Sequence, residues 1–210
     1  MDGGLPSGYN VEGTIHTYVP TATSPDGTLA ATAKTSASGT ATGSVEVSDA
    51  ASRRVLARLV RRPAVNVIAF AADGRTVVTG YVDGIARVWD VSTGRPLHTF
   101  PAHSGAVQSV AFSPDGTLLA TGGDDKTVKL WDLRTDKRLL TLRGHNRTVT
   151  SLAFSPGGTR LAAGAEDGIV RVYVLPIGEL MTISRERLTR GWTQAECARY
   201  LRDGRCPTDR

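Results

Sequence analysis

Short runs of alternating apolar and polar residues fill the middle of the chain, and residues typical of tight turns separate them. Within residues 103–142 these runs are Val107–Phe112, Leu118–Thr121, Val128–Trp131 and Arg138–Leu142. Asp115-Gly116 and Gly122-Gly123 lie between consecutive runs. Because Asp-Gly and Gly-Gly readily adopt the left-handed conformations that tight strand connections need, the pattern predicts hairpins of antiparallel strands. Together the four runs predict a four-stranded antiparallel unit.

The same unit recurs along the chain at a constant spacing. Three sets of residues lie 42 positions apart: Phe70, Phe112 and Phe154; Trp89, Trp131 and Tyr173; Asp83, Asp125 and Asp167. Repetition every ~40–45 residues, with Trp-Asp closing the unit, is typical of the blades of a β-propeller. We therefore predict an all-β fold with four blades, at approximately residues 14–60, 61–102, 103–144 and 145–183, after an irregular leader at residues 1–13.

The repeated motifs resemble those of the WD40 repeat family. Gly144-His145 opens a unit, Ser-Pro-Asp-Gly follows the first strand at residues 113–116, and Trp89-Asp90 and Trp131-Asp132 close two units. The resemblance covers about 170 of the 210 residues. It implies an incomplete ring, because rings of the family usually contain more than four blades. Three interpretations stay open: a terminal piece of a longer protein with further blades upstream, two copies that form a ring of about eight blades, or a distorted monomer.

The resemblance also implies a structural network inside each blade. In the family a His, a strand Ser or Thr, a turn Asp and the Trp form a buried hydrogen-bonded set, and here a complete set is present at His103, Thr121, Asp125 and Trp131. Two units keep part of the set: Thr79, Asp83 and Trp89 with Arg61 in place of the His, and His145, Asp167 and Tyr173 with Ala163 in place of the Thr. The first unit has Ser48-Asp49 in place of Trp-Asp. Since buried polar groups need partners, we expect cohesion to peak in the third blade.

A binding surface follows from the same resemblance. WD40 proteins commonly bind partners with residues just after the blade-opening His and just before the turn Asp. The matching positions are Ala64, Asn66 and Val82, then Ala106, Gln108 and Asp124, then Thr148, Thr150 and Glu166. They lack the Trp, Tyr and Arg anchors that usually carry interface energy. We expect a non-catalytic protein-interaction scaffold with unidentified protein partners. The alternative is the regulatory C-terminal part of a multidomain bacterial signalling ATPase or kinase whose catalytic part is not in this chain.

The sequence offers little support for catalysis. His103, Ser109 and Asp125 are residue types of a nucleophilic triad, but the His and the Asp recur in the next unit, and a catalytic site is not normally duplicated blade by blade. No phosphate-binding loop, His-Glu-x-x-His or Gly-x-Ser-x-Gly motif is present. The four histidines show no metal-ligand spacing with the two cysteines. We expect no enzymatic activity, no metal and no cofactor.

Charge and hydropathy bear on partners and location. The net charge is +5, but the 25 basic and 20 acidic residues are interspersed, which favours a solvated surface over a nucleic-acid footprint. The first residues lack the basic start and apolar segment of a secretory signal. No stretch approaches the roughly 20 apolar residues that span a bilayer. We therefore expect a cytoplasmic protein without membrane contact.

The last residues differ from the repeats. Thr193–Glu196 is a capping-box sequence and Gly204 a helix terminator, so a short helix is predicted in a tail at residues 184–210. This tail looks like the C-terminal extension of some large bacterial WD40 proteins. Cys197 and Cys206 are close enough in sequence to form a disulfide under oxidising conditions, and two reduced thiols are the alternative.

Overall fold

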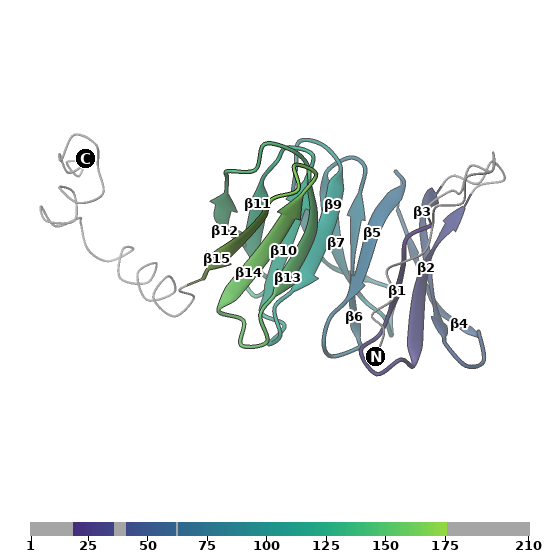
Figure 1. Cartoon of the computed structure of the whole chain (residues 1–210). Helices are drawn as coiled ribbons and strands as arrows, with labels where there is room; N and C mark the ends of the chain where they lie inside the picture. The colour runs from purple at the N-terminus through teal and green to yellow at the C-terminus, as the bar shows by residue number, and fades with distance from the viewer. Residues whose placement is uncertain (1–18, 36–40, 62, 176–210) are drawn as a thin grey trace, which may run out of the picture. The chain divides into compact units, whose positions relative to one another are not determined.

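The computed structural model describes residues 19–35, 41–61 and 63–175 (Figure 1). The chain divides into two compact units, residues 1–173 and 174–210. The strands of the described residues lie in the first unit, apart from Val174 at the end of the last one. The predicted leader, the tail with its helix, and Cys197 and Cys206 lie outside the described residues, so they stay predictions.

The described residues form fifteen β-strands in four antiparallel sheets, each of which is a meander with neighbouring strands consecutive in sequence. The first sheet comprises β1 (Thr21–Thr23), β2 (Leu29–Thr35), β3 (Ala41–Asp49) and β4 (Val55–Val60). The second comprises β5 (Val65–Phe70), β6 (Thr76–Tyr81), β7 (Ile85–Asp90) and β8 (Pro96–Pro101). The third comprises β9 (Val107–Phe112), β10 (Leu118–Gly123), β11 (Val128–Asp132) and β12 (Lys137–Leu142). The fourth comprises β13 (Val149–Phe154), β14 (Arg160–Ala165) and β15 (Val170–Val174).

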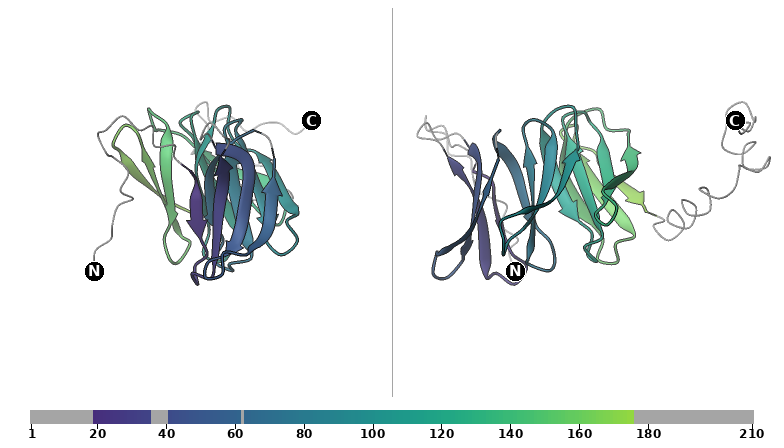
Figure 2. Two further views of the ribbon diagram at one scale, coloured as in Figure 1. Left: turned by 90° about the vertical axis from the view of Figure 1, so that its right-hand side faces the viewer. Right: turned by 180° about the vertical axis from the view of Figure 1, so that it is seen from behind.

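This architecture confirms the predicted fold class, an all-β segment of four propeller blades. The first strands of successive sheets contact one another in order, β1 with β5, β5 with β9 and β9 with β13, and Figure 2 shows the sheets following one another in chain order. Among the described residues the fourth sheet has three strands, whereas the other three sheets have four. The described part of the chain holds no helix that is long and apolar enough to cross a membrane.

Ser-Pro-Asp-Gly sequences close the first hairpin in two sheets. In the third sheet the Ser113 hydroxyl donates to Asp115 Oδ1 at 2.5 Å and accepts from the Leu118 amide at 2.9 Å. Gly116 follows with a φ of 68°, a left-handed conformation that glycine adopts at little cost. Ser24 and Asp26 make the equivalent bond at 2.6 Å in the first sheet. The side chains therefore fix the turn that the sequence pattern predicts.

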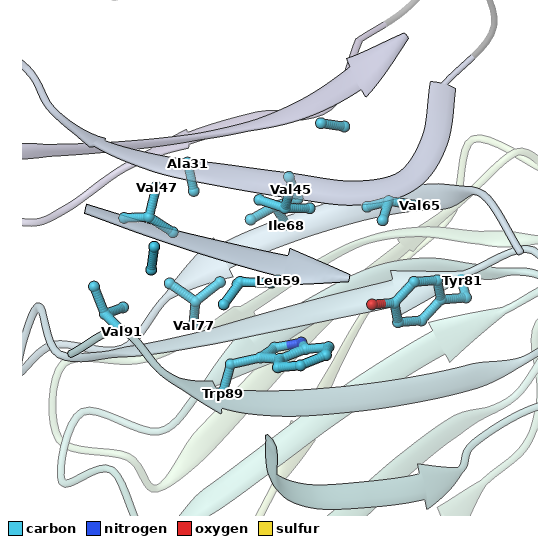
Figure 3. Close-up of a cluster of buried hydrophobic side chains, with 12 residues drawn as sticks. Ala31, Val45, Val47, Leu59, Val65, Ile68, Val77, Tyr81, Trp89 and Val91 are labelled. Atoms are coloured by element: carbon cyan, nitrogen blue, oxygen red, sulfur yellow. The ribbon is translucent and has the colours of Figure 1, made fainter. Parts of the chain in front are cut away.

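Apolar residues on facing sheets form the core. Between the first and second sheets the buried cluster is Ala31, Ala33, Val45, Val47, Ala57, Leu59, Val65, Ile68, Val77, Tyr81, Trp89 and Val91 (Figure 3). Between the second and third it is Val78, Ala86, Val88, Phe100, Ala102, Val107, Val110, Leu119 and Trp131. The second sheet packs on both sides: Val77 belongs to the first cluster and its neighbour Val78 to the second, as the period of two in a β-strand requires.

Candidate functional site

A continuous set of side-chain hydrogen bonds crosses the third sheet. The indole Nε1 of Trp131 donates to Thr121 Oγ1 at 3.1 Å. Thr121 Oγ1 lies 2.9 Å from His103 Nε2, and His103 Nδ1 lies 2.7 Å from Asp125 Oδ1. Because the indole can only donate and an ionised carboxylate can only accept, the set is satisfied when Thr121 donates to Nε2 and a neutral His103 donates from Nδ1.

The electrostatics of this set agree with that assignment. Burial lowers the pKa of His103 below its ordinary value, although the Asp125 carboxylate acts in the opposite direction. Burial by itself would raise the pKa of Asp125, but the hydrogen bonds from Thr127 and His103, together with the charge of Lys129, outweigh it and hold this pKa well below the usual range. A neutral imidazole beside an ionised carboxylate is therefore the stable pair at neutral pH.

The backbone around His103 joins the third sheet to the second. The His103 amide donates to Gly84 O at 2.8 Å, and Gly84 has a φ of 83°. A Cβ at Gly84 would lie 2.0 Å from the His103 carbonyl oxygen, so no side chain fits there. Lys129 Nζ also donates to the Ala102 carbonyl. The network therefore holds the loop before β9 against the turn of the preceding blade.

Ser109 takes no part in this set. Its hydroxyl donates to the Val149 carbonyl of the fourth sheet at 3.1 Å. The structure thus brings His103 and Asp125 together and directs Ser109 toward the neighbouring sheet. Among the described residues there is also no group of three His, Cys, Asp or Glu side chains that would hold a metal ion.

The second sheet has a variant of the network. Trp89 Nε1 donates to Thr79 Oγ1 at 2.8 Å, and the Thr79 hydroxyl donates to the Tyr81 hydroxyl at 3.0 Å. Arg61, which occupies the position of the histidine, forms an ion pair with Asp83 at 2.9 Å and stacks over the Tyr81 ring at 4.7 Å. The sequence analysis did not predict Tyr81 as a member of this network. Its position on the same strand as Thr79, two residues later and so on the same side of the strand, was the available signal. An ion pair and a cation–π contact here replace the His–Asp hydrogen bond.

The fourth sheet does not assemble the set that its sequence resembles. His145 is buried, and within the described part of the chain neither of its ring nitrogens has a hydrogen-bond partner. The Tyr173 hydroxyl is likewise buried and unpaired there. Asp167 accepts from the Asn146 and Ile169 amides at 3.2 and 3.0 Å. Since Ala163 has no hydroxyl, the link that Thr121 provides in the third sheet is missing.

The expected partner-binding positions lie next to one another in each blade. One backbone hydrogen bond recurs in all three repeats: Val82 N to Ala64 O at 3.2 Å, Asp124 N to Ala106 O at 3.1 Å, and Glu166 N to Thr148 O at 3.0 Å. The residue just before the turn Asp is therefore held against the residue that precedes the first strand. Val82 is 46% exposed, Thr150 and Glu166 are also exposed, and Thr148 is half-buried.

Side chains connect these positions between two blades. Asn66 Nδ2 donates to Gln108 Oε1 at 2.7 Å and to the Val107 carbonyl at 2.9 Å. Gln108 Nε2 donates to Asp124 Oδ1 at 2.9 Å, and Asp124 Oδ2 accepts from the Ala106 amide at 3.0 Å. The result is a hydrogen-bonded row from the second sheet to the third. We call Asn66, Val82, Gln108, Asp124, Thr148, Thr150 and Glu166 the binding face.

A cavity of about 240 Å³ lies at the opposite end of the second and third sheets, beside Asp73, Phe112, Asp115 and Leu133. The sequence analysis placed Phe112 in a strand and Asp115 in a turn and gave neither a binding role. Asp73 accepts from the Arg75 and Thr76 amides, and Asp115 from Ser113 and Thr117, so the hairpins use both carboxylates. We assign no binding role to this cavity.

The chain contains repeated meander sheets that pack on one another through apolar residues, and one of them holds a complete Trp–Thr–His–Asp set. These features define a β-propeller segment built from WD-type repeats. The family description "WD domain, G-beta repeat" matches residues 94–132 and 136–173. The description "Anaphase-promoting complex subunit 4 WD40 domain" matches residues 32–112. The chain therefore belongs to the WD40 repeat family, whose repeats generally serve protein–protein interaction and not catalysis.

A curated relative adds one repeat of similarity. "Autophagy-related protein 16" from Arabidopsis thaliana is 45% identical to this chain over 42 residues. The match covers 20% of this chain and 8% of that protein. The similarity thus extends over the length of a single repeat, and it supports the repeat assignment only. The interpretation of the chain as part of a bacterial signalling ATPase or kinase finds no support in these comparisons.

Proposed function

We propose that this protein is an interaction scaffold that binds a protein partner at the binding face. The observation that carries the proposal is the hydrogen-bonded row from Asn66 through Gln108 to Asp124. Bonds within the row hold these long polar side chains in one arrangement before a partner arrives. Less side-chain entropy is then lost on binding, which is the advantage of a pre-organised surface.

The chemistry of the binding face favours a polar, basic segment of the partner. Asp124 and Glu166 occupy equivalent positions in neighbouring blades, 42 residues apart, and both carry carboxylates. Lys or Arg side chains of a partner complement such charges, which mainly improves specificity and the association rate. Val82, with 46% of its surface exposed, adds an apolar contact at the corresponding position of the second blade.

The affinity expected from this surface is modest. Interface energy usually comes from a few buried Trp, Tyr or Arg residues, and none is among the seven residues of the binding face. We therefore expect a reversible complex whose stability falls as salt concentration rises, because exposed charges are screened.

Thr150→Arg tests the proposal, because Thr150 is exposed and a long cationic side chain there would obstruct a basic partner. Thr99→Arg on β8 is the matched control, since Thr99 is also an exposed threonine and lies on the last strand of its sheet. Proteins captured from cell extract by the wild type and both variants are quantified, and each captured protein is then purified and titrated calorimetrically. We expect Thr150→Arg to weaken binding about tenfold or more and Thr99→Arg to leave it unchanged. Equal binding to both variants would show that the binding face is not used.

A further inference from the structure

Glycines on the middle strands make room for the next blade. A Cβ at Gly80 would lie 2.7 Å from Val107 Cγ1 of the third sheet, and a Cβ at Gly122 would lie 2.7 Å from Val149 Cγ1 of the fourth. Real Cβ atoms do not approach so closely, so each glycine leaves a hollow that a valine of the following sheet fills. The two glycines are 42 residues apart, and the hollow is therefore part of the repeat.

Gly164 provides the same hollow on the fourth sheet. The three atoms nearest to a Cβ placed there belong to Ser151 and Val170, both in the fourth sheet itself. In contrast to Gly80 and Gly122, Gly164 therefore has no valine of another sheet against it among the described residues. Within the described part of the chain the hollow therefore holds the Ser151 hydroxyl, with Oγ 2.4 Å from the position of a Cβ, but no valine of a following sheet.

Beside this hollow the fourth sheet exposes valines. Val170 and Val172 are 68% and 60% exposed, whereas Val128 and Leu130, the equivalent residues of the third sheet, are 0% and 1% exposed. We call Gly164, Val170 and Val172 the coupling face. Its strand neighbours Ala162 and Ser151 are small and uncharged, and the nearest charge on this side of β14 is the exposed Arg160, at the far end of the strand from Gly164. It offers both projecting valines and a hollow of valine size.

The outer face of the first sheet has the opposite character. Glu46 forms ion pairs with Lys34 at 2.7 Å and Arg58 at 3.2 Å. Thr21 and Thr23 on β1 are exposed. A polar outer face of this kind suits the solvated end of a repeat array. Packing it on exposed valines would remove three charged groups from water without new partners, which is unfavourable.

We propose that the coupling face binds the coupling face of a second copy of this chain. In a symmetric dimer the same patch is used twice, so valines of each copy lie over the hollow at Gly164 of the other. The charged face of the first sheet takes no part, which argues against a head-to-tail ring of two copies. The coupling face lies on two short strands, whereas a stable interface buries ~800 Å² per partner. The dimer is therefore reversible and depends on concentration.

The mass of the full-length chain in solution tests this inference. Light scattering is measured over about a hundredfold range of loading concentration, with reductant present so that Cys197 and Cys206 cannot form bonds between copies. The wild type should rise from its monomer mass of 22.2 kDa toward twice that value. Val172→Thr keeps a β-branched side chain and the strand, so it should stay folded and raise the dissociation constant about tenfold.

Val60→Thr is the matched control, because Val60 is 65% exposed and lies on β4 of the first sheet. It should dimerise as the wild type does, and a circular dichroism melt of each variant verifies folding. A wild type that stays monomeric at the highest concentration would overturn the inference and favour a different polypeptide as the occupant of the coupling face. Equal loss of dimer in Val60→Thr and Val172→Thr would also overturn it, since the first sheet would then be part of the contact.

Discussion

Replacement of Thr121 by valine removes one hydroxyl from the centre of the third blade and keeps the shape of the side chain. Thr121 is fully buried, and its hydroxyl accepts from Trp131 Nε1 and lies within hydrogen-bond distance of His103 Nε2. The substitution therefore leaves two buried polar groups without partners. Each unsatisfied group costs about 1–3 kcal/mol, and the added methyl group recovers part of this. We expect the free energy of unfolding to fall by about 2–4 kcal/mol.

Equilibrium unfolding in urea, followed by tryptophan fluorescence, measures this loss. Thr99→Val is the control, because the same substitution at an exposed position should change stability by less than about 0.5 kcal/mol. Removing His103 as well should cost less than the sum of the two single effects, since Thr121 and His103 share one hydrogen bond of the network. A Thr121→Val protein as stable as the Thr99→Val protein would refute the view that this network holds the blade together.

Two further predictions concern the incomplete network of the fourth blade and the effect of pH. Ala163→Thr places a hydroxyl where Thr121 has its own in the third sheet, so it should give His145 and Tyr173 a partner and raise the free energy of unfolding by about 1 kcal/mol in the same urea assay. If Ala163→Thr does not raise the free energy of unfolding, or lowers it equally with and without Tyr173→Phe, the new hydroxyl does not reach His145 and Tyr173. Burial lowers the pKa of both His103 and His145 in the folded protein, so the unfolded chain binds more protons as pH falls below the ordinary value of about 6.5. Stability should therefore be fully present above that pH and decline as pH falls through the folded-state pKa values. Urea titrations at several pH values between pH 8 and 5 measure the decline, and a His145→Gln protein with the same pH dependence as the wild type would exclude a contribution from His145.

The strand pattern was predictable from local sequence wherever turn residues bound the apolar runs. Val107–Phe112 is a strand with the predicted limits. The strand at Pro96–Pro101 was not predicted, because a proline at each end masks its alternation. In the structure β8 is the last strand of its sheet, a position where the missing amide hydrogens of proline can be tolerated.

For the binding face, the sequence predicted which residues belong to it but not which of them form hydrogen bonds with one another. The resemblance named Asn66, Gln108 and Asp124 separately, but the bond from Asn66 to Gln108 joins two blades and depends on how the sheets pack. In the same way, the sequence shows Gly80, Gly122 and Gly164 at equal spacing. It does not show that a valine of the following sheet packs against Gly80 and Gly122, because that contact depends on how the sheets pack. Spacing along the chain identifies equivalent residues, whereas packing decides what each one touches.

The fourth blade combines the two features that most weaken cohesion, an incomplete polar network and an uncovered apolar face. His145 and Tyr173 lack partners within the described residues, and Val170 and Val172 are exposed. Covering the coupling face would bury these valines and, by mass action, stabilise the folded state in proportion to how far the concentration exceeds the dissociation constant. The fourth blade should then gain more than the third, whose polar network is already complete. Dimerisation should therefore oppose local opening of the fourth blade. The melting temperature of the wild-type chain should rise with protein concentration, and that of Val172→Thr should rise less.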